Sequence, residues 1–408
     1  MRKLHLKQIS GIKNTKIQIT GSKSETNRLL ILQALYPKIQ IDNSSNSDDS
    51  QLMTKALQSQ DEIIDIHHAG TAMRFLTAYF AVQSGRRTIL TGSQRMQERP
   101  IKILVDALRQ MGCRIDYQKN EGYPPIKIIG TRPTQNKVIL AANVSSQYIS
   151  ALMLIASSLP EGLTITLEGK ITSIPYIKMT ISLLKEAGIT SEFRENTITI
   201  SPAENIPVKK LIVESDWSSA SYFYSIVALS HKSSLQLRSY KKNSYQGDSV
   251  LAEIYQKFGI ETHFASDQIH LEKKSEASFE ILELDLSNAP DIAQTIAVTC
   301  FGLGKACYLT GLHTLKIKET DRLEALKTEI EKLGGKVYIT EDSLELEPSD
   351  SIKSGVAIKT YNDHRMAMAF APLALKTDLI IENAEVVSKS FPDYWRDLEA
   401  LGFRFEGV

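Results

Sequence analysis

The chain has 408 residues, more than one compact core normally holds, so two domains of roughly 200 residues each are expected. Its net charge of +1 argues against a surface built for nucleic acid or for an anionic membrane. The three cysteines are scattered and form no CxxC pair, which predicts reduced thiols. The sequence shows no signal peptide and no long apolar run, so a cytoplasmic protein without a membrane span is expected. Any anionic ligand must then be bound by basic side chains that the fold brings together.

A helix-like segment that ends in glycine and is followed by two short strands occurs five times along the chain. These glycines recur at intervals of about 70 residues, which indicates a repeated βαβ-type unit. They are Gly112, Gly188, Gly259, Gly334 and Gly402. Each is expected to take the left-handed conformation that ends its helix. In the strand ENTITI, residues 195–200, the isoleucines should point inward and the threonines outward. A sixth, weaker copy is placed at residues 51–66, so that six units form two groups of three.

The first polar motif in the chain is GSKSETNR, residues 21–28, directly before an apolar helical segment. Free backbone N–H groups and the helix dipole make such an end favourable for an anion. Ser24 and Arg28 are four residues apart and share one helix face, from which both can reach the same oxyanion. The Walker A pattern is absent, so a nucleotide P-loop is not supported. A simple solvated helix cap remains the alternative.

Two further motifs of the N-terminal half place glycine or arginine before a helix. In AGTAMR, residues 69–74, Gly70 permits close approach of the backbone to a ligand. His67 and His68 precede this motif, but adjacent residues on an extended segment point to opposite sides and no HExxH or Cys partner is present, so no metal is expected. In RMQERP, residues 95–100, two arginines precede a proline that begins a helix. Ordinary surface charge is the alternative there.

Two helices open with hydroxyl and amide side chains. SSQ, residues 145–147, begins a strongly apolar helix, and SIPY, residues 173–176, begins the next. These groups can hydrogen-bond a polyol or a phosphate, or they can simply cap the helix. The residues alone leave both interpretations open.

The C-terminal half repeats this design with charged residues. NAPD, residues 288–291, begins a helix whose dipole favours an ionised carboxylate suited to accept a proton. KIKETDR, residues 316–322, gathers opposite charges before a helix, and salt-bridged capping is the alternative interpretation. NDHR, residues 362–365, places His and Arg on the first turn of a helix apolar enough to be buried, and Lys389 lies in SKSFPDYW, residues 388–395.

Taken together and in order, these motifs resemble the 5-enolpyruvylshikimate-3-phosphate synthase family over residues 21–395. The matching segments are GSKSxxNR, AGTAMR, RMxERPI, SSQ, SxPY, SDxSSASYF, PDxAxTIA, KETDR, NDHRMAM and SKSFPDY. The resemblance implies an α/β protein with the two-domain enolpyruvyl transferase fold, an inside-out α/β barrel in which each domain consists of three βαβαββ repeats. It implies one domain made of residues 1–19 and 217–408 and another made of residues 20–216, with the active site in the cleft between them.

The resemblance also implies a metal-independent enzyme without a cofactor. Such an enzyme moves the enolpyruvyl group of phosphoenolpyruvate to the 5-hydroxyl of shikimate 3-phosphate through a tetrahedral intermediate, and phosphate is released. The two small molecules are the expected partners, and a monomer is expected.

The family's site residues transfer to this sequence motif by motif. Those implied for phosphoenolpyruvate are Lys23, Gly70, Arg99, Gln147, Arg322, Arg365 and Lys389. Those implied for shikimate 3-phosphate are Lys23, Ser24, Arg28, Ser145, Ser146, Gln147, Ser173, Tyr176, Asp291 and Lys318. Glu319 and Lys23 are the candidate proton donors, and Asp291 is the candidate acceptor that activates the hydroxyl.

Several positions depart from the family pattern. Thr314 stands where an Asn near shikimate 3-phosphate is usual, while His68 and Phe75 flank the phosphoenolpyruvate motif and leave sensitivity to inhibitors such as glyphosate open.

Three alternatives to this family fit the sequence less well. The related transferase that acts on UDP-N-acetylglucosamine has a reactive Cys in the loop before Arg99, and this loop has none. RNA 3′-phosphate cyclase is disfavoured by the near-neutral charge and because the sequence around that enzyme's catalytic histidine is absent here. A non-catalytic scaffold is disfavoured because the charged residues of the motifs are retained.

Overall fold

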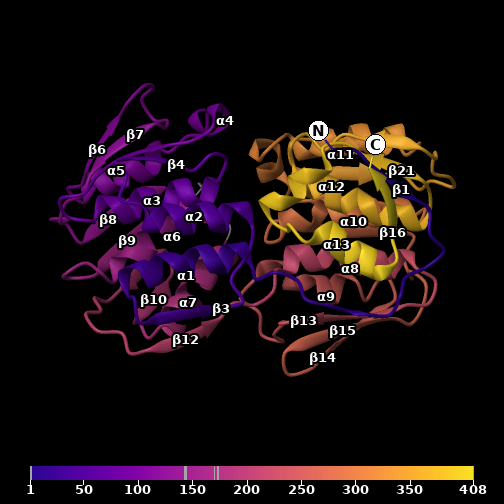
Figure 1. Ribbon diagram of the computed structural model, residues 1–408, viewed down its shortest axis with the longest axis horizontal. Coiled ribbons are helices and arrows are strands. Elements are labelled where there is room, and N and C mark those ends of the chain that lie inside the picture. The colour runs from indigo at the N-terminus through magenta and orange to yellow at the C-terminus, as the bar shows by residue number, and fades with distance from the viewer. Residues whose placement is uncertain (1, 142–144, 170, 172–173, 408) are drawn as a thin grey trace. The chain divides into compact units, whose positions relative to one another are not determined.

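The chain forms two compact units in the computed structural model, which describes residues 2–141, 145–169, 171 and 174–407. One unit combines Met1–Thr20 with Glu214–Val408 and is called the discontinuous unit below. The other, the continuous unit, consists of Gly21–Val213 and runs from indigo to magenta in Figure 1.

The boundaries of these units differ slightly from the expected ones, which placed residue 20 and residues 214–216 in the other domain. The Asp216 N–H donates to the Thr20 carbonyl (3.1 Å), and the Ser215 hydroxyl donates to the Ile19 carbonyl (2.7 Å). The Trp217 indole N–H donates to a Glu214 carboxylate oxygen (2.8 Å). These contacts join both short segments to the discontinuous unit.

The continuous unit contains two complete βαβαββ repeats and one partial repeat. The first complete repeat comprises β4 (Ile63–Asp65), α3 (Gly70–Ala81), β5 (Arg87–Thr91), α5 (Lys102–Gln110), β6 (Arg114–Tyr117) and β7 (Ile126–Ile129), with the short α4 (Gln94–Gln97) before α5. The second comprises β8 (Lys137–Ala141), α6 (Ser146–Ala156), β9 (Leu163–Glu168), α7 (Ile174–Glu186), β10 (Ser191–Arg194) and β11 (Thr197–Ile200). The partial repeat comprises α1 (Lys23–Leu35), β3 (Ile39–Asp42), α2 (Asp48–Gln58) and β12 (Lys209–Ile212).

The discontinuous unit contains three repeats, and the start of the chain completes two of them. The first comprises β2 (Lys16–Ile17), α8 (Trp217–Leu229), β13 (Ser234–Arg238), η1 (Gly247–Val250), α9 (Leu251–Ile254), β14 (Ile260–Phe264) and β15 (Gln268–Lys273). The second comprises β16 (Ile281–Asp285), η2 (Pro290–Ile292), α10 (Ala293–Gly302), β17 (Ala306–Thr310), η3 (His313–Ile317), α11 (Arg322–Lys332), β18 (Val337–Ile339) and β19 (Leu344–Leu346). The third comprises β20 (Val356–Ile358), α12 (His364–Phe370), η4 (Ala371–Leu375), β21 (Leu379–Ile381), η5 (Ala384–Lys389), α13 (Tyr394–Leu401), β22 (Arg404–Gly407) and β1 (Leu4–Lys7).

All five four-stranded sheets have the same strand order, which confirms the predicted repetition. In β4-β5-β7-β6 the first pair is parallel and the other two pairs are antiparallel. The sheets β8-β9-β11-β10, β2-β13-β15-β14, β16-β17-β19-β18 and β20-β21-β1-β22 repeat this pattern. In the last of them β1, from the beginning of the chain, occupies the place that a hairpin strand takes in the other repeats.

The sixth copy does not lie where the sequence placed it. Residues 51–66 are part of α2 followed by β4, and β4 pairs with β5 as the first strand of the next repeat. The sixth sheet is instead the parallel pair β12-β3, which has only two strands among the described residues. The hairpin of the other repeats is therefore missing from this one.

The predicted helix-ending glycines are confirmed. All five have positive φ, between 80° for Gly259 and 104° for Gly334. The helix before Gly259 is shorter than expected, because α9 covers only Leu251–Ile254 and turns follow it. In β11 both isoleucines are buried and the threonines are not, as the alternation predicts.

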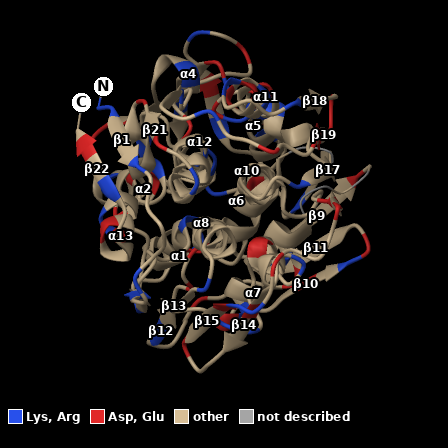
Figure 2. Ribbon diagram, turned by 90° about the vertical axis from the view of Figure 1, so that its right-hand side faces the viewer, with Lys and Arg blue, Asp and Glu red and all other residues tan. Residues whose placement is uncertain are grey.

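The first helix of each repeat is the interior one. Every residue of α10 is buried, as is every described residue of α6 except one, and both helices are mostly apolar, as helices of a core are. Figure 2 shows α8, α10 and α12 in the middle of the discontinuous unit, with strands of its three sheets around them. This is the inside-out arrangement, with helices within and sheets outside. No helix in the described parts of the chain is long and apolar enough to cross a membrane.

Candidate active site

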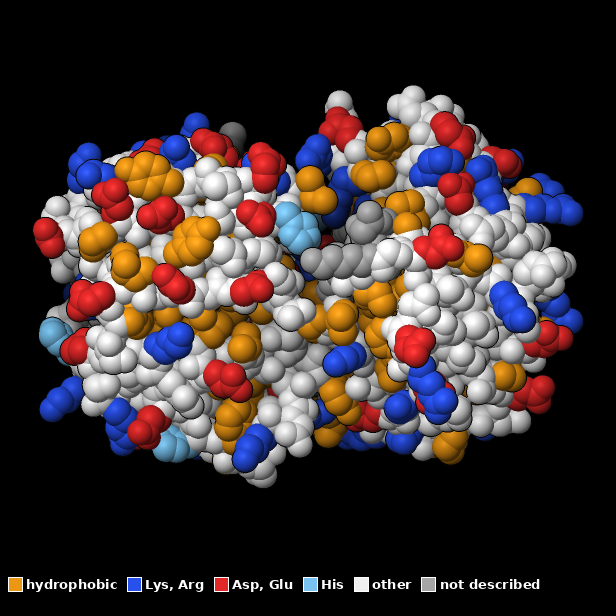
Figure 3. Space-filling view, turned by 180° about the vertical axis from the view of Figure 1, so that it is seen from behind, with side chains coloured by type: hydrophobic (Ala, Val, Ile, Leu, Met, Phe, Trp, Pro, Cys, Tyr) orange, Lys and Arg blue, Asp and Glu red, His pale blue; other side chains and the backbone are white. Residues whose placement is uncertain are grey.

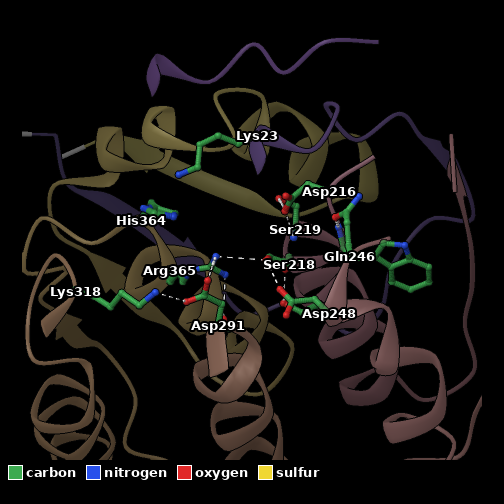
Figure 4. Close-up of polar contacts among 12 residues, drawn as sticks. Lys23, Asp216, Ser218, Ser219, Gln246, Asp248, Asp291, Lys318, His364 and Arg365 are labelled. Atoms are coloured by element: carbon green, nitrogen blue, oxygen red, sulfur yellow. Dashed lines mark hydrogen bonds and ion pairs between the residues drawn. The ribbon is translucent and has the colours of Figure 1, made fainter. Parts of the chain in front are cut away.

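The charged motifs of the C-terminal half meet at the N-terminal ends of the three interior helices of the discontinuous unit. Ser218 lies on the first turn of α8, Asp291 in η2 just before α10, and Arg365 on the first turn of α12. Figure 4 shows them side by side. Arg365 Nη2 is 3.3 Å from Asp291 Oδ2, Arg365 Nη1 donates to the Asp291 carbonyl (3.0 Å), and Nη2 reaches Ser218 Oγ at 3.4 Å. Helix N-termini favour anionic groups, so their convergence suits an anionic ligand.

Arg322, the first residue of α11, is held by three carboxylates. Its Nη1 donates to Asp291 (2.8 Å), its Nη2 to Glu319 (2.9 Å) and its Nε to Asp363 (2.6 Å), and its side chain is only 2% exposed. Burial alone would lower the pKa of this guanidinium, but the three carboxylates outweigh burial and raise the pKa above its usual value. The salt-bridged capping considered for KETDR is therefore present, with Asp321 as the N-cap.

Asp291 is the negative centre of this cluster. Lys318 Nζ lies 3.7 Å from its Oδ1, in addition to the contacts with Arg322 and Arg365. Burial by itself would raise the pKa of Asp291, but Arg365, Lys318 and Arg322 overcome burial and hold the pKa well below the usual value. The neighbouring cations thus strongly stabilise the ionised form of this carboxylate.

Lys389 and Arg365 retain capacity for a ligand in different ways. The Lys389 ammonium donates to the carbonyl of Asn362, a residue with a left-handed backbone, φ 56°. The Nε of Arg365 is buried without a hydrogen-bond partner among the described residues. A buried N–H that lacks a partner is costly unless something else binds it.

In the continuous unit, Lys23 is the first residue of α1, which Ser22 caps through the Glu25 N–H. Its ammonium lies 3.5 Å from the carboxylate of Asp49 on α2, and the Lys23 side chain is 25% exposed. Asp49 does not belong to any of the motifs that the sequence singles out. The structure makes it the counter-ion of a predicted site residue.

Arg28 is more deeply enclosed than the sequence suggested. Its nitrogens donate to Thr180 Oγ1 (2.8 Å), the Ser24 carbonyl (2.8 Å) and Ser150 Oγ (3.0 Å). Its guanidinium carbon lies 5.9 Å from the centre of the Tyr176 ring. Burial lowers the pKa of Arg28 to about 10. Arg28 therefore contacts Ser24 through the Ser24 backbone carbonyl, and the expectation that both side chains reach one oxyanion stays a prediction.

Gly70, the first residue of α3, is in close contact with Arg99. A Cβ at position 70 would lie 2.5 Å from Arg99 Nη1, so a guanidinium already lies close to this glycine. Arg74, one turn later, donates to the Gly70 carbonyl (3.1 Å) and to the Pro100 carbonyl (3.2 Å), and thereby fixes the loop that carries Arg99. Gln147, on the first turn of α6, donates to Thr71 Oγ1 (3.3 Å).

The remaining predicted residues are three serines of the SSQ and SIPY motifs. Ser145 is the N-cap of α6 and accepts from the Gln147 N–H (3.4 Å), so the capping interpretation holds for it. Ser146 is buried on the first turn of that helix. Ser173 lies outside the residues that the structure describes. In the described ranges, no group of three or more His, Cys, Asp or Glu side chains is placed to hold a metal ion.

Both units therefore consist of repeated sheets around interior helices whose N-termini carry cationic and polar side chains. This is the fold of the enolpyruvyl transferases. An EPSP synthase structure from Acinetobacter baumannii superimposes with a TM-score of 0.82 at 19% identity, covering 100% of both chains. The enolpyruvyl transferase NikO from Streptomyces tendae gives a TM-score of 0.76 at 12% identity, covering 100% of this chain and 99% of that one.

Sequence comparison identifies the family. Residues 57–398 match the family model of EPSP synthase (3-phosphoshikimate 1-carboxyvinyltransferase). A 3-phosphoshikimate 1-carboxyvinyltransferase of Bacteroides fragilis (strain YCH46) is 46% identical over 398 residues, covering 97% of this chain and 96% of that protein. One of Mannheimia haemolytica is 35% identical over 438 residues, covering 99% and 100%. The chain belongs to the EPSP synthase family, and the resemblance seen in its motifs is confirmed.

Proposed function

We propose that this protein transfers the enolpyruvyl group of phosphoenolpyruvate to the 5-hydroxyl of shikimate 3-phosphate and releases phosphate, a step of the shikimate pathway to the aromatic amino acids. Family membership over most of the chain and the shared name of its relatives support this reaction. The structural observation that carries the proposal is the group of Arg365, Arg322 and Lys318 around Asp291, at the N-terminal ends of buried helices.

Phosphoenolpyruvate carries a phosphate and a carboxylate on a three-carbon frame, so it requires several cationic donors. Each charge-assisted hydrogen bond contributes roughly 1.5–3 kcal/mol net. Within the described part of the chain the Arg365 Nε has no hydrogen-bond partner, so it is one donor that a ligand would satisfy. The residues proposed to bind this substrate are Lys23, Gly70, Arg99, Gln147, Arg322, Arg365 and Lys389.

Shikimate 3-phosphate offers a second phosphate, a carboxylate and free hydroxyls. Hydroxyl, amide and cationic side chains at helix N-termini can bind all three kinds of group. The enclosed Arg28 would act mainly through its charge and by orienting Ser24 and Tyr176. The residues proposed to bind this substrate are Lys23, Ser24, Arg28, Ser145, Ser146, Gln147, Ser173, Tyr176, Asp291 and Lys318.

Anion binding would change the basicity of Asp291. Its pKa is low because Arg365, Lys318 and Arg322 face it. When anionic substrate groups take over part of the contacts with these cations, the cations stabilise the Asp291 carboxylate less, and its pKa rises toward the range in which a general base is effective. Asp291 would then become able to accept the hydroxyl proton only when the substrates are in place.

The reaction proceeds by addition and elimination. Protonation of the methylene carbon makes C2 of phosphoenolpyruvate electrophilic, and the 5-hydroxyl attacks C2 while Asp291 takes its proton. The tetrahedral intermediate then loses a proton from the new methyl group, and the C2–O bond to phosphate breaks. Lys23 is proposed as the proton donor in preference to Glu319, because the Glu319 carboxylate is already engaged by the Arg322 guanidinium (2.9 Å).

The Gly70→Ala variant is expected to raise the KM for phosphoenolpyruvate by roughly tenfold, the equivalent of one weakened charge-assisted hydrogen bond. The new Cβ would collide with the end of the flexible Arg99 side chain and displace its guanidinium, while the backbone stays in place. Steady-state kinetics and thermal melts would measure this, with the KM for shikimate 3-phosphate and the melting temperature unchanged. Gly11→Ala is the control, since nothing lies within 4 Å of a Cβ there. An unchanged KM for phosphoenolpyruvate would contradict the assignment of Gly70 and Arg99.

Phosphate release with both substrates tests the proposed function directly. Release is expected only when phosphoenolpyruvate and shikimate 3-phosphate are both present. UDP-N-acetylglucosamine in place of shikimate 3-phosphate should give none, and neither should an RNA 3′-phosphate. No release with the two proposed substrates would refute the function and favour a scaffold that has kept the fold.

The same proposal includes a monomer in the cytoplasm. The three cysteines are buried and none forms a disulfide, which suits a reducing compartment. Mass measurement in solution across a range of concentrations would establish the oligomeric state.

A further inference from the structure

One buried carboxylate beside the proposed site has no part in the mechanism above. Asp248 lies in η1 and is only 6% exposed. Its Oδ2 accepts a hydrogen bond from the hydroxyl of Ser218. Figure 4 shows the two side chains next to Arg365 and Asp291. A buried carboxylate is costly, so its partners indicate what it does there.

Ser218 joins Asp248 to Arg365. Because a serine hydroxyl has one proton and that proton is directed at Asp248, its lone pairs are left to accept from the guanidinium. The Nη2 of Arg365 reaches this oxygen at 3.4 Å, and the same nitrogen lies 3.3 Å from Asp291 Oδ2. Arg365 is therefore held between two carboxylates, Asp291 directly and Asp248 through Ser218.

The segment that carries Asp248 is fixed to the start of α8 at a second point. Gln246 Oε1 accepts from the Trp217 N–H (2.9 Å), and Gln246 Nε2 donates to the Ser215 carbonyl (3.0 Å). Asp216, the N-cap of α8, accepts from the Ser219 N–H (2.7 Å). The residues on both sides of Ser218 are thus anchored, which leaves its hydroxyl little freedom to move away.

We infer that Asp248 and Ser218 form a positioning pair that holds the Arg365 guanidinium in the orientation needed in the transition state. This inference rests on the proposed function of the site. Without Ser218 as acceptor, the strongest remaining attraction on Arg365 is Asp291, and the guanidinium is free to turn fully toward that carboxylate. The pair would thereby keep Arg365 available for the anionic group of phosphoenolpyruvate.

The charges that face Asp248 make the pair sensitive to pH. Asp291 and Asp216 are negative, whereas Arg365 is positive and Ser218 donates a hydrogen bond. Burial first, and then Asp291, raise the pKa of Asp248 to about 7. Above this pH the carboxylate is ionised and binds the Ser218 hydroxyl strongly. Below it, wild-type Asp248 is neutral and resembles asparagine.

The test compares Asp248→Asn with wild type in steady-state phosphate release at pH 6 and pH 8. At pH 8 kcat is expected to fall by about tenfold, the equivalent of one lost charge-assisted hydrogen bond. The KM for phosphoenolpyruvate should stay unchanged or fall, because removing a negative charge beside Arg365 does not weaken ground-state attraction for an anion. At pH 6 the two enzymes should have similar kcat values. Because the substrate titrates identically for both enzymes, the ratio of their kcat values at each pH is independent of substrate titration.

Ser218→Ala should reproduce the loss at pH 8, and the double variant should lose no more than either single one, since the two residues act as one unit. Ser218→Thr, which keeps the hydroxyl, should recover activity. Asp397→Asn is the control: Asp397 is also a buried carboxylate, with a pKa raised to about 6 by burial, but it pairs with Arg396 on α13. Its kcat should equal that of wild type.

Folding and function are separable in this design. The folded-state pKa of Asp248 exceeds its ordinary value of 3.8, so the ionised carboxylate costs stability progressively as pH rises from about 4 to about 7. Asp248→Asn lacks this cost and should melt at least as high as wild type at pH 8. Equal kcat at pH 8 in an active wild type, or additive losses in the double variant, would overturn the inference. An inactive wild type would overturn the proposed function instead, and the inference with it.

Discussion

Asp291→Asn is expected to lower turnover by roughly 1,000-fold while phosphoenolpyruvate still binds. Asparagine has the same shape as aspartate but cannot accept the hydroxyl proton, and general-base catalysis contributes roughly 100- to 10,000-fold. The variant also removes one negative charge that faces Arg365, Lys318 and Arg322, so the cations become more available to an anion. Single-turnover phosphate release and equilibrium binding of phosphoenolpyruvate measure the two effects separately.

The same substitution should destabilise the protein. Breaking a buried ion pair from one side costs roughly 3–5 kcal/mol, and the loss here should be at the lower end because Arg322 keeps Glu319 and Asp363. The pKa of Asp291 is depressed, so its stabilisation is complete above the ordinary value of 3.8 and is lost only as pH falls through the lower folded-state pKa. The Asp291 carboxylate itself should therefore contribute equally from pH 5 to 9. Any change in the unfolding free-energy difference over this range should follow the titration of Asp248, whose pKa Asp291 raises.

Asp321→Asn is a matched control for this experiment. Asp321 caps α11 next to the cluster, and asparagine caps a helix equally well, so neither activity nor stability should change appreciably. Near-normal turnover of Asp291→Asn would remove Asp291 from the role of base. Loss of phosphoenolpyruvate binding would show instead that the residue organises the cations.

Lys23→Met should also lower turnover by roughly 1,000-fold, because loss of a proton donor and of one charge contact act together. Methionine keeps the unbranched shape without the ammonium. Lys23 is partly exposed but Asp49 is buried, so the variant leaves a buried carboxylate without its cation and the free energy of unfolding should fall by about 1–3 kcal/mol. Phosphate release and thermal melts are the measurements.

Lys55→Met is the control for Lys23. Lys55 is an exposed lysine on α2 of the same unit, and its replacement should leave kcat and both KM values unchanged. Lys23→Arg should not restore activity, because guanidinium remains protonated at neutral pH and cannot act as the donor. Activity of Lys23→Met within tenfold of wild type would exclude Lys23 as the proton donor and return the role to another group.

The repeats could be predicted from the sequence because their signals are local. A glycine with positive φ ends a helix regardless of what surrounds it, and Gly112 and Gly402 both do so. The sixth copy of the repeat was misplaced because a helix followed by a strand does not reveal which other strand that strand pairs with. Only the pairing of β4 with β5 assigns it to the next repeat. The length of α9 was overestimated for a similar reason, since apolar spacing also fits a 3-10 helix followed by turns.

The site was predicted through the order of its motifs, and the contacts within it were not. Ser218 and Arg365 are 147 residues apart, and Ser218 and Asp248 are 30 apart. Nothing in the local pattern around Asp248 or Asp49 distinguishes them from ordinary surface aspartates. Their contacts with Ser218 and Lys23 come from the sheets and interior helices that bring distant segments together, which is a property of the tertiary structure.

The place of β1 between β21 and β22 bears on how the polypeptide is made. Leu4 pairs with Ile381 on one side and with Gly407 on the other, so β1 leaves the ribosome long before either of its partner strands has been made. The continuous unit, in contrast, is complete once Val213 has emerged. Folding during translation would therefore begin with the continuous unit. It would end with the discontinuous unit, whose two segments lie before and after the continuous unit in the sequence.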